Sequence, residues 1–279
     1  MKLLRFGPKG QEKTGLLDDD GVVRDLSAHL PDLGGAALAR LADLKDLEPA
    51  DLPAVENPGR IGAALSHVPN FYAVGLNYNE HAAELDAEPP AEPILFSKAA
   101  SSLAGPHDPL VLPCASEKSD WEVELGVVIG RTARYVQEKD ALDHVAGYCV
   151  VNDISERAFQ LEHGGQWMKG KSAPGFGPVG PWIVTADEIG DPQSLALSTR
   201  LNGEVMQSSS TSDMIFSVAK VIAYMSQFME LRPGDLIATG TPPGVGMGKS
   251  PQRFLMPGDV LDLQVDGLGA QRTEILPSA

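Results

Sequence analysis

The stretch that decides the fold is Asp120-Trp-Glu-Val-Glu-Leu-Gly-Val-Val-Ile129, where carboxylates alternate with apolar residues before an apolar run. This pattern predicts a β-strand, in which successive side chains point to opposite faces. Glu122 and Glu124 therefore project from one side, about 7 Å apart. Two carboxylates on an apolar strand are costly unless a cation or an arginine neutralises them. The pattern allows a metal site or a strand face in contact with solvent, with the alternate positions pointing inward: Val123, Leu125, Val127 and Ile129.

Further short apolar runs flank this stretch, and they are separated by Gly and Pro, which number 29 and 22 among 279 residues. Such punctuation favours short strands and turns over long helices. We expect strands at residues 121–129, 144–152, 181–185, 195–201, 236–239 and 260–265. Two Pro-Gly-Asp segments, 233–235 and 257–259, predict type II turns with a positive φ at the glycine.

The first 65 residues differ in pattern from the rest and predict a small N-terminal domain and linker, followed by a catalytic domain at 66–279. Short strands are expected at 2–6, 14–17 and 22–26, and leucines at 38, 41 and 44 have helical spacing. One longer helix is expected at 214–229, capped by Ser212 or Asp213 and ended by Pro233-Gly234. The fold class predicted is mainly β (α+β) with a few peripheral helices.

Composition excludes several classes of function. The net charge of −16 argues against a protein that grips nucleic acid. No apolar run reaches 18 residues and the N-terminus lacks the apolar stretch of a secretory signal, so we expect no membrane span and a soluble, cytoplasmic protein. The two cysteines, Cys114 and Cys149, are too few for a disulfide framework and are expected to be small buried hydrophobes.

A third carboxylate follows another apolar strand. Asp153 comes directly after Tyr148-Cys-Val-Val-Asn152, and Ser155 is placed to cap a helix starting near Glu156. A Glu-x-Glu pair and an Asp with no His or Cys nearby form an all-oxygen ligand set, which suits Mg²⁺, with Mn²⁺ or Ca²⁺ as alternatives, and disfavours zinc.

A candidate acid-base pair lies in Gly75-Leu-Asn-Tyr-Asn-Glu-His-Ala-Ala-Glu84. If Asn79 caps a short helix, His81 and Glu84 lie on one face at i and i+3. A carboxylate beside an imidazole fixes its tautomer and raises its basicity, as activation of water requires. An ordinary surface ion pair has the same spacing.

Cations and a glycine-rich loop are candidates for binding an anionic substrate. Arg157 and Gln160 are spaced i and i+3, and Lys169 and Lys171 follow in a Gly-rich segment. Residues 238–250 contain Gly248-Lys-Ser250, which ends like a phosphate-binding loop, but the first glycine of that motif is replaced by Pro243. We therefore reject nucleotide binding and expect a rigid loop that presents Thr241 and backbone amides to a carboxylate.

Taken together, these segments resemble the fumarylacetoacetate hydrolase family. The matching stretches are Gly75-Leu-Asn-Tyr-x-x-His81-x-x-Glu84, Asp120-x-Glu-x-Glu124-Leu, Asn152-Asp-x-Ser-x-Arg157, Lys171-Ser172 and Thr239-Gly-Thr-Pro-x-Gly-Val-Gly246. The run Gly165-Gln-Trp-Met-Lys-Gly-Lys171 is most similar to a subgroup described as ureidoglycolate lyases or hydrolases of 2,4-diketo-3-deoxy sugar acids. The resemblance implies a mixed β-roll/β-sandwich catalytic domain and a homodimer.

The resemblance also implies roles for individual residues. The Mg²⁺ ligands would be Glu122, Glu124 and Asp153. The catalytic residues would be His81 and Glu84, on a short mobile helix, together with Lys171. The substrate-binding residues would be Arg157, Gln160, Thr241 and Lys98. Some relatives have an arginine where this chain has Leu76, so any substrate contact of that arginine is missing here.

The implied reaction is hydrolysis of a carbon–carbon bond in a 2,4-dioxo acid to pyruvate, or a similar acid, and a second carboxylic acid. The same site without hydrolysis could serve a lyase, a decarboxylase or an isomerase acting on a 2-oxo acid or ureidoglycolate. A non-catalytic anion-binding protein with this fold is a more distant alternative, because binding alone would not need His81 and Glu84 together.

Overall fold

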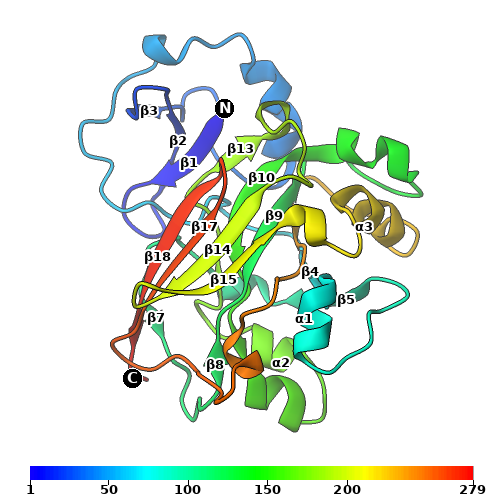
Figure 1. Cartoon of the computed structure of the whole chain (residues 1–279). Coiled ribbons are helices and arrows are strands. Elements are labelled where there is room, and N and C mark those ends of the chain that lie inside the picture. The colour runs from blue at the N-terminus through cyan, green and yellow to red at the C-terminus, as the bar shows by residue number, and fades with distance from the viewer. Residues whose placement is uncertain (279) are drawn as a thin grey trace.

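Two β-sheets account for most of the architecture, which the computed structural model describes for residues 1–278 (Figure 1). The large sheet contains, in spatial order, β3 (Val23–Asp25), β2 (Lys13–Leu17), β1 (Lys2–Phe6), β13 (Ile183–Thr185), β10 (Val145–Asn152), β9 (Val123–Ile129), β16 (Leu236–Ala238), β4 (Phe71–Gly75) and β5 (Ile94–Lys98). The small sheet contains β15 (Glu204–Ser210), β14 (Ala196–Leu201), β17 (Val260–Val265), β18 (Gly269–Leu276) and β7 (Leu110–Val111). The β-rich fold class is thus confirmed.

The remaining elements are short. Two further strand pairs join β8 (Ser119–Asp120) with β11 (Ser155–Glu156), and β6 (Leu103–Ala104) with β12 (Gly177–Pro178). The α-helices are α1 (Asn79–Glu84), α2 (Met168–Lys171) and α3 (Val218–Met225). The 3₁₀ helices are η1 (Gly35–Leu44), η2 (Pro49–Asp51), η3 (Ala100–Ser102), η4 (Glu138–His144), η6 (Ala186–Glu188), η7 (Thr211–Asp213) and η8 (Gly246–Gly248), and η5 (Ala158–Glu162) is a π-helix.

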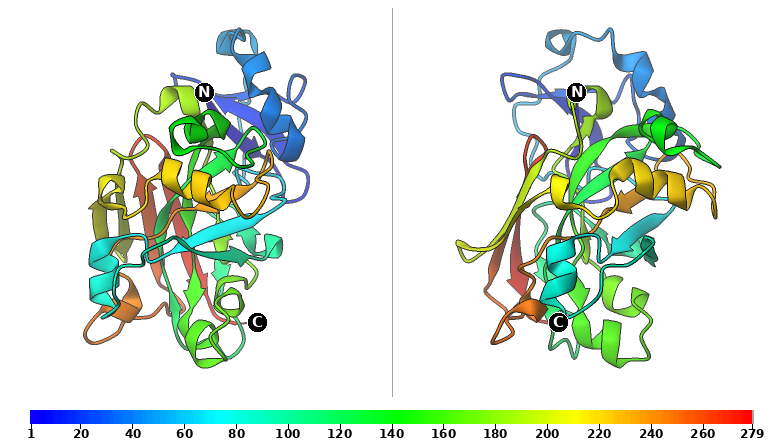
Figure 2. Two further views of the ribbon diagram at one scale, coloured as in Figure 1. Left: turned by 90° about the vertical axis from the view of Figure 1, so that its right-hand side faces the viewer. Right: turned by 45° about the vertical axis from the view of Figure 1, so that its right-hand side comes forward.

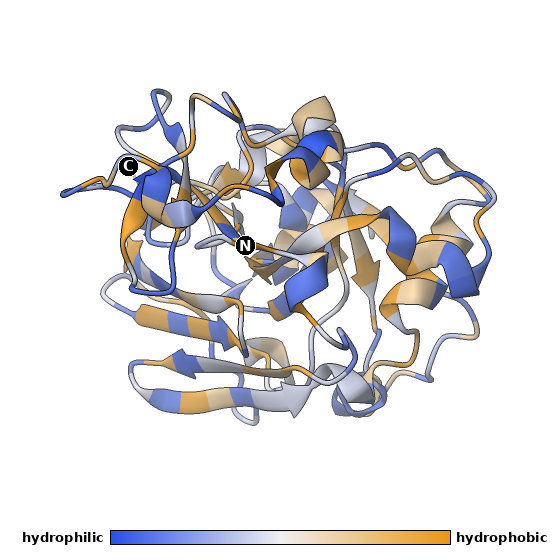
Figure 3. Cartoon of the chain, turned by 90° about the horizontal axis from the view of Figure 1, so that it is seen from above, coloured by the Kyte–Doolittle hydropathy of each residue, from blue (hydrophilic) through white to orange (hydrophobic). Residues whose placement is uncertain are grey.

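Strand β9 lies near the middle of the large sheet, and both of its faces are covered. Its alternate residues Val123, Leu125, Val127 and Ile129 belong to the core shared with the small sheet, as predicted. Val128, on the opposite face, belongs to a second core that includes residues of the N-terminal strands. Every residue of β9 is buried, so the alternative of a solvated strand face is wrong. Along the small sheet, at the lower edge of Figure 3, hydrophobic and hydrophilic residues alternate.

The N-terminal strands continue the large sheet. Strand β1 pairs antiparallel with β13, with Lys2 opposite Val184, and β2 and β3 follow outward. Both views in Figure 2 place this region at the top of the molecule and helices α1 and α2 toward the other end. A boundary near residue 65 between an N-terminal domain and a catalytic domain stays a prediction.

The predicted helix at 214–229 is shorter in the structure, where α3 covers Val218–Met225. Its start is delayed because the Asn77 side chain accepts a hydrogen bond from the Phe216 amide (2.8 Å) and donates one to the Phe216 carbonyl (3.0 Å), which ties this segment to the strand β4 region. Ser217, and neither Ser212 nor Asp213, caps α3 by accepting a bond from the Lys220 amide.

Three other local predictions are corrected. Asn79 is the first residue of α1 and makes no capping bond, since Tyr78 occupies the N-cap position. Ser155 pairs with Asp120 in the β11–β8 ladder instead of capping a helix, and the π-helix η5 begins only at Ala158. Cys149 is buried as expected, but Cys114 is exposed.

The two Pro-Gly-Asp turns are confirmed. Gly234 has φ +90° and Gly258 has φ +91°, in the left-handed region where glycine carries no steric penalty. In each turn the Asp amide donates to the carbonyl three residues before it, from Asp235 to Arg232 and from Asp259 to Met256. Among the described residues, no helix combines the length and apolar character needed to cross a membrane.

Strands β10 and β13 approach each other closely at Gly147, so a larger residue there should lower the stability of the protein. A Cβ atom added at Gly147 would lie 2.3 Å from the Val184 carbonyl oxygen, whereas one added at Gly190 would meet nothing within 4 Å. We expect Gly147→Ala to lower the free energy of unfolding by about 1–3 kcal/mol. Gly190→Ala should leave it unchanged or raise it by up to about 1 kcal/mol. Urea unfolding of both variants measures this, and equal midpoints would contradict it.

Candidate active site

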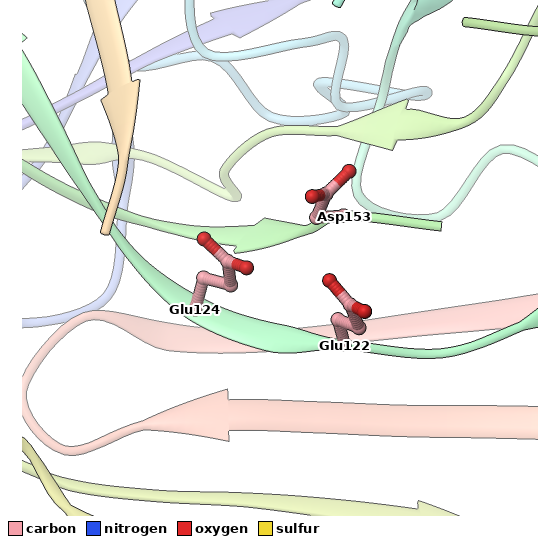
Figure 4. Close-up of side chains that lie close together, drawn as sticks. All are labelled: Glu122, Glu124 and Asp153. Carbon is pink, nitrogen blue, oxygen red and sulfur yellow. The ribbon is translucent and has the colours of Figure 1, made fainter. Parts of the chain in front are cut away.

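Three buried carboxylates converge where β9 and β10 lie side by side. Glu122 directly precedes β9 and projects from the same side as Glu124, and Asp153 directly follows β10 (Figure 4). The register pairs Asn152 with Val123, and the Asp153 amide donates to the Glu122 carbonyl (2.9 Å), which places Asp153 opposite the glutamates. One oxygen of each carboxylate lies within 4.8 Å of the others. The predicted oxygen ligand set is therefore assembled in space.

Three cations are buried against these acids. Lys171 Nζ lies 2.7 Å from Glu122 Oε2 and 2.8 Å from Asp153 Oδ2. Arg157 Nη1 lies 2.7 Å from Glu122 Oε1, and Lys98 bonds to the other oxygen of Asp153. Lys169 is exposed, so only the second lysine of the predicted pair reaches the site.

Helix α2 brings Lys171 to the carboxylates because Gly170 allows a close approach. A Cβ at Gly170 would lie 2.5 Å from the Glu156 carbonyl oxygen and 2.6 Å from the Gln160 amide nitrogen. Any larger residue would push α2 away from the segment 156–160. The glycine next to Lys171 is therefore part of the reason that its ammonium can bridge two acids.

The carboxylates differ in their electrostatic surroundings. Burial would raise the pKa of Glu122, but the charges of Lys171 and Arg157 outweigh it and lower that pKa to about 2. Burial and the neighbouring charges of Asp153 and Glu122 raise the pKa of Glu124 well above its usual value. Among the described residues Glu124 has no cationic partner, and it accepts only the Gly240 amide (2.7 Å).

This charge distribution fits a divalent metal ion. Three buried carboxylates with oxygens close together, one of them lacking a cation, are stable together when a hard cation shares them. The donor set holds oxygen alone, which is what Mg²⁺, Mn²⁺ and Ca²⁺ prefer. The site is therefore a candidate divalent-metal centre, with Glu122, Glu124 and Asp153 as the residues that would hold the ion.

The predicted pair of His81 and Glu84 forms on α1. His81 Nδ1 lies 3.0 Å from Glu84 Oε2, and the imidazole is only 4% exposed, so the pair is not an ordinary surface ion pair. The Gly244 amide donates to Glu84 Oε1 (2.8 Å), and a Cβ at Gly248 would lie 2.3 Å from Glu84 Cδ. The glycine-rich loop therefore fixes the carboxylate that orients the imidazole.

Two of the acids, two of the cations and the imidazole line one cavity of about 220 Å³, and Asp153 is not among its lining residues. Its polar lining residues are His81, Glu122, Glu124, Arg157, Gln160, Lys171 and Thr241. Its apolar lining residues are Val74, Gly75, Leu76, Leu85, Ala87, Phe96, Leu161, Trp167 and Met247. The volume is below the roughly 300–1,000 Å³ of sites for drug-sized ligands, which indicates a small ligand. Lys98 does not belong to this lining, because its ammonium lies against Asp153.

Asp120 is a residue whose role the sequence did not predict. It is fully buried and accepts bonds from Arg157 Nε (2.9 Å), the Gly246 amide (2.6 Å) and the Met247 amide (3.1 Å). Its place two residues before Glu122 was the available signal, but the contact with a loop 126 residues away could not be read from spacing. The loop amides thus bind carboxylates of the protein itself, Glu84 and Asp120.

Thr241 is held from two sides. Its hydroxyl donates to the Val123 carbonyl (2.9 Å) and accepts from Gln207 Nε2 (2.8 Å). Gln207 in turn accepts from the Val123 amide (3.1 Å), so this side chain from the small sheet fixes the strand and the loop together. The sequence pattern did not single out Gln207.

Comparisons with known proteins establish the family of this chain. The family model described as fumarylacetoacetate (FAA) hydrolase C-terminal matches residues 70–276. A Burkholderia lata protein named "Putative hydrolase" is 56% identical over 274 residues, covering 97% of each chain. The chain therefore belongs to the fumarylacetoacetate hydrolase family. It is a metal-dependent enzyme of the hydrolase or isomerase kind within that family.

Two solved structures are similar over nearly the whole chain. Fumarylacetoacetate hydrolase from Exiguobacterium antarcticum has a TM-score of 0.86 and 35% identity, covering 99% of both chains. Maleylpyruvate hydrolase from Sphingobium sp. SYK-6, solved with manganese(II) and pyruvate, has a TM-score of 0.81 and 28% identity, covering 100% of both.

If Glu124 is a metal ligand, its replacement should weaken metal binding. We expect Glu124→Gln to weaken Mn²⁺ binding at least about 100-fold, since a ligand is lost. The metal-free variant should be no less stable than the wild type, because a buried carboxylate without a cation is removed. Isothermal titration calorimetry measures the affinity, and Glu204→Gln, on an exposed position of β15, is the matched control. Unchanged affinity in the Glu124 variant would remove it from the ligand set.

Proposed function

We propose that this protein hydrolyses the C3–C4 bond of a 2,4-dioxo acid with Mg²⁺, and that its substrate is an acylpyruvate or a diketo-deoxy sugar acid. The products would be pyruvate, or a similar 2-oxo acid, and a second carboxylic acid. The observation that carries the proposal is that Glu122, Glu124 and His81 line one small cavity, while Asp153 lies beside the glutamates and Glu84 is bonded to the imidazole. Support also comes from the similar maleylpyruvate hydrolase, whose structure holds manganese(II) and pyruvate.

The proposed metal ligands and the cations would both act on the acid head of the substrate, which is its carboxylate and 2-oxo group. Held by Glu122, Glu124 and Asp153, Mg²⁺ would supply Lewis-acid stabilisation of the charge that develops on the 2-oxo oxygen. Lys171, already bridging Glu122 and Asp153, adds a fixed positive charge at the same place. Arg157, Gln160 and Thr241 would contact the substrate from the polar part of the lining.

The pair of His81 and Glu84 supplies the base. Glu84 accepts a hydrogen bond from Nδ1–H of His81, which leaves Nε2 unprotonated and able to take a proton from water. The water oxygen bonds to C4, the C3–C4 bond breaks, and its electron pair passes to C3, which then takes a proton. One water is consumed, and one carboxylic acid and one pyruvate are released.

Isomerisation of a related oxo acid is the second candidate. A probable 2-hydroxyhepta-2,4-diene-1,7-dioate isomerase from Mycobacterium abscessus has a TM-score of 0.85 and 33% identity to this chain, covering 100% of both. Lyase and decarboxylase reactions, ureidoglycolate cleavage included, would use the same carboxylates. Only hydrolysis requires a water activated by His81.

We also propose that the protein is a homodimer. Light scattering after gel filtration tests this by measuring the mass of the particle in solution.

The assay that tests the function is Mg²⁺-dependent release of pyruvate from acylpyruvates, fumarylpyruvate and diketo-deoxy sugar acids, run in ¹⁸O-water. We expect release with at least one substrate, loss of release with a chelator, and one ¹⁸O in the second acid. Turnover without ¹⁸O in the acid would replace hydrolysis by one of the other reactions. No turnover of any 2,4-dioxo acid would reject the proposal.

If His81 activates the water, its replacement should lower kcat and leave the affinity for the metal ion nearly unchanged. We expect His81→Ala to lower kcat about 10²–10⁴-fold, because the general base is removed. Mn²⁺ affinity should change little, since His81 is outside the carboxylate set. His29→Ala, at an exposed position in the N-terminal region, is the matched control. Wild-type kcat in the His81 variant would assign the base elsewhere.

A further inference from the structure

The lining of the cavity is charged near the carboxylates and becomes apolar with distance from them. Lys171 Nζ lies 5.2 Å from the centroid of the Phe96 ring, and Phe96 packs edge-on against Trp167 with ring centroids 5.4 Å apart. Trp167 lies directly over Gly75, where a Cβ atom would be 2.4 Å from Cζ3 of the indole. An apolar wall therefore leads from the charged end of the cavity to the backbone beside Leu76.

The rest of this wall is apolar as well. Leu85 and Ala87 follow α1, Leu161 belongs to η5, and Met247 belongs to η8. Among the described residues that line the cavity, the only lysine and arginine are Lys171 and Arg157, and both form salt bridges with Glu122. The wall thus offers no free cation to a second negative charge on a ligand and few partners to a row of hydroxyls.

The backbone holds Leu76 at its place in the wall. Leu76 has φ +52°, a left-handed conformation that is uncommon for a leucine. The next residue, Asn77, is fully buried, and its side-chain amide donates to the carbonyls of Thr239 (2.8 Å) and Phe216 (3.0 Å). The position of Leu76 is therefore fixed by bonds to two other segments.

From these observations we infer that the substrate carries a short apolar acyl group and a single negative charge, with Leu76 and Trp167 as specificity-determining residues. This rests on the proposed function for the identity of the acid head. Burying a second carboxylate against this wall is unfavourable, because nothing there pairs with it. Each methylene buried there favours binding by about fourfold. Acylpyruvates with an alkyl acyl group are thus preferred over fumarylpyruvate and diketo-deoxy sugar acids.

The test uses two 2-oxo acids that have no 4-oxo group and so cannot be cleaved. They are 2-oxohexanoate and 2-oxoadipate, which share six carbons and differ in a terminal methyl or carboxylate. We expect the wild-type protein with saturating Mg²⁺ to bind 2-oxohexanoate at least about tenfold more tightly in isothermal titration calorimetry. Equal or tighter binding of 2-oxoadipate would overturn the inference without any variant.

A charge placed at Leu76 should reverse this order. Leu76→Arg is expected to bind 2-oxoadipate more tightly than 2-oxohexanoate, because a cation then faces the second carboxylate. The matched control is Leu142→Arg, the same change at an exposed position of η4, which should keep the wild-type order. If Leu76→Arg folds and keeps the wild-type order, Leu76 does not determine specificity.

The binding test addresses the inferred apolar acyl group and the cleavage assay addresses the proposed hydrolysis, so one can be rejected without the other. If 2-oxohexanoate is preferred but no 2,4-dioxo acid is cleaved, the inferred apolar tail stands and the proposed hydrolysis falls. If 2,4-dioxo acids are cleaved but kcat/KM is higher for fumarylpyruvate than for an alkyl acylpyruvate, hydrolysis stands and the inference falls.

Discussion

The constraint on which the rest of the structure depends is the burial of Glu122 between Lys171 and Arg157, next to two further acids. An isolated carboxylate at this depth would be too costly to keep ionised. The cations that allow it come from α2 and from the segment after β11, so these elements must pack against the end of β9. Glu124 is left without a cationic partner among the described residues, and burial beside two other acids raises its pKa well above the usual value, because ionisation there is costly. A divalent ion would offset that cost, which makes the same arrangement a candidate metal site.

The loop 240–248 connects the candidate metal ligands to the proposed catalytic pair of His81 and Glu84. Its Gly244 amide holds Glu84, and its Gly246 amide holds Asp120, which in turn bonds Arg157. The glycines are needed for contact as well as for conformation, since a Cβ at Gly246 would lie 1.8 Å from the Arg253 carbonyl oxygen. One loop therefore sets the position of Glu84 relative to Asp120 and Arg157. A shift of the loop would displace Glu84 and Asp120 at once.

The sequence predicted much of this and missed what depends on long-range packing. Alternation in 120–129 predicted the strand and the common face of Glu122 and Glu124, because the two-residue period is a local property. Both Pro-Gly-Asp turns were likewise predicted, because glycine tolerates the positive φ that a type II turn requires. The start of α3 was placed too early, because a side chain 139 residues away, Asn77, holds Phe216 outside the helix. Asp120 was overlooked since its partners are amides of a distant loop. The sheet order, with β1 beside β13, also has no local signal.

Above all, we expect Glu122, Glu124 and Asp153 jointly to bind one divalent cation beside the cavity that His81 lines. Anomalous diffraction from crystals grown with Mn²⁺ tests it most directly. We expect one anomalous peak with an oxygen of each of the three carboxylates at a bonding distance of about 2.0–2.6 Å. An empty carboxylate site, or a peak held by other residues while Glu122 and Asp153 stay paired with the lysines and Arg157, would contradict it.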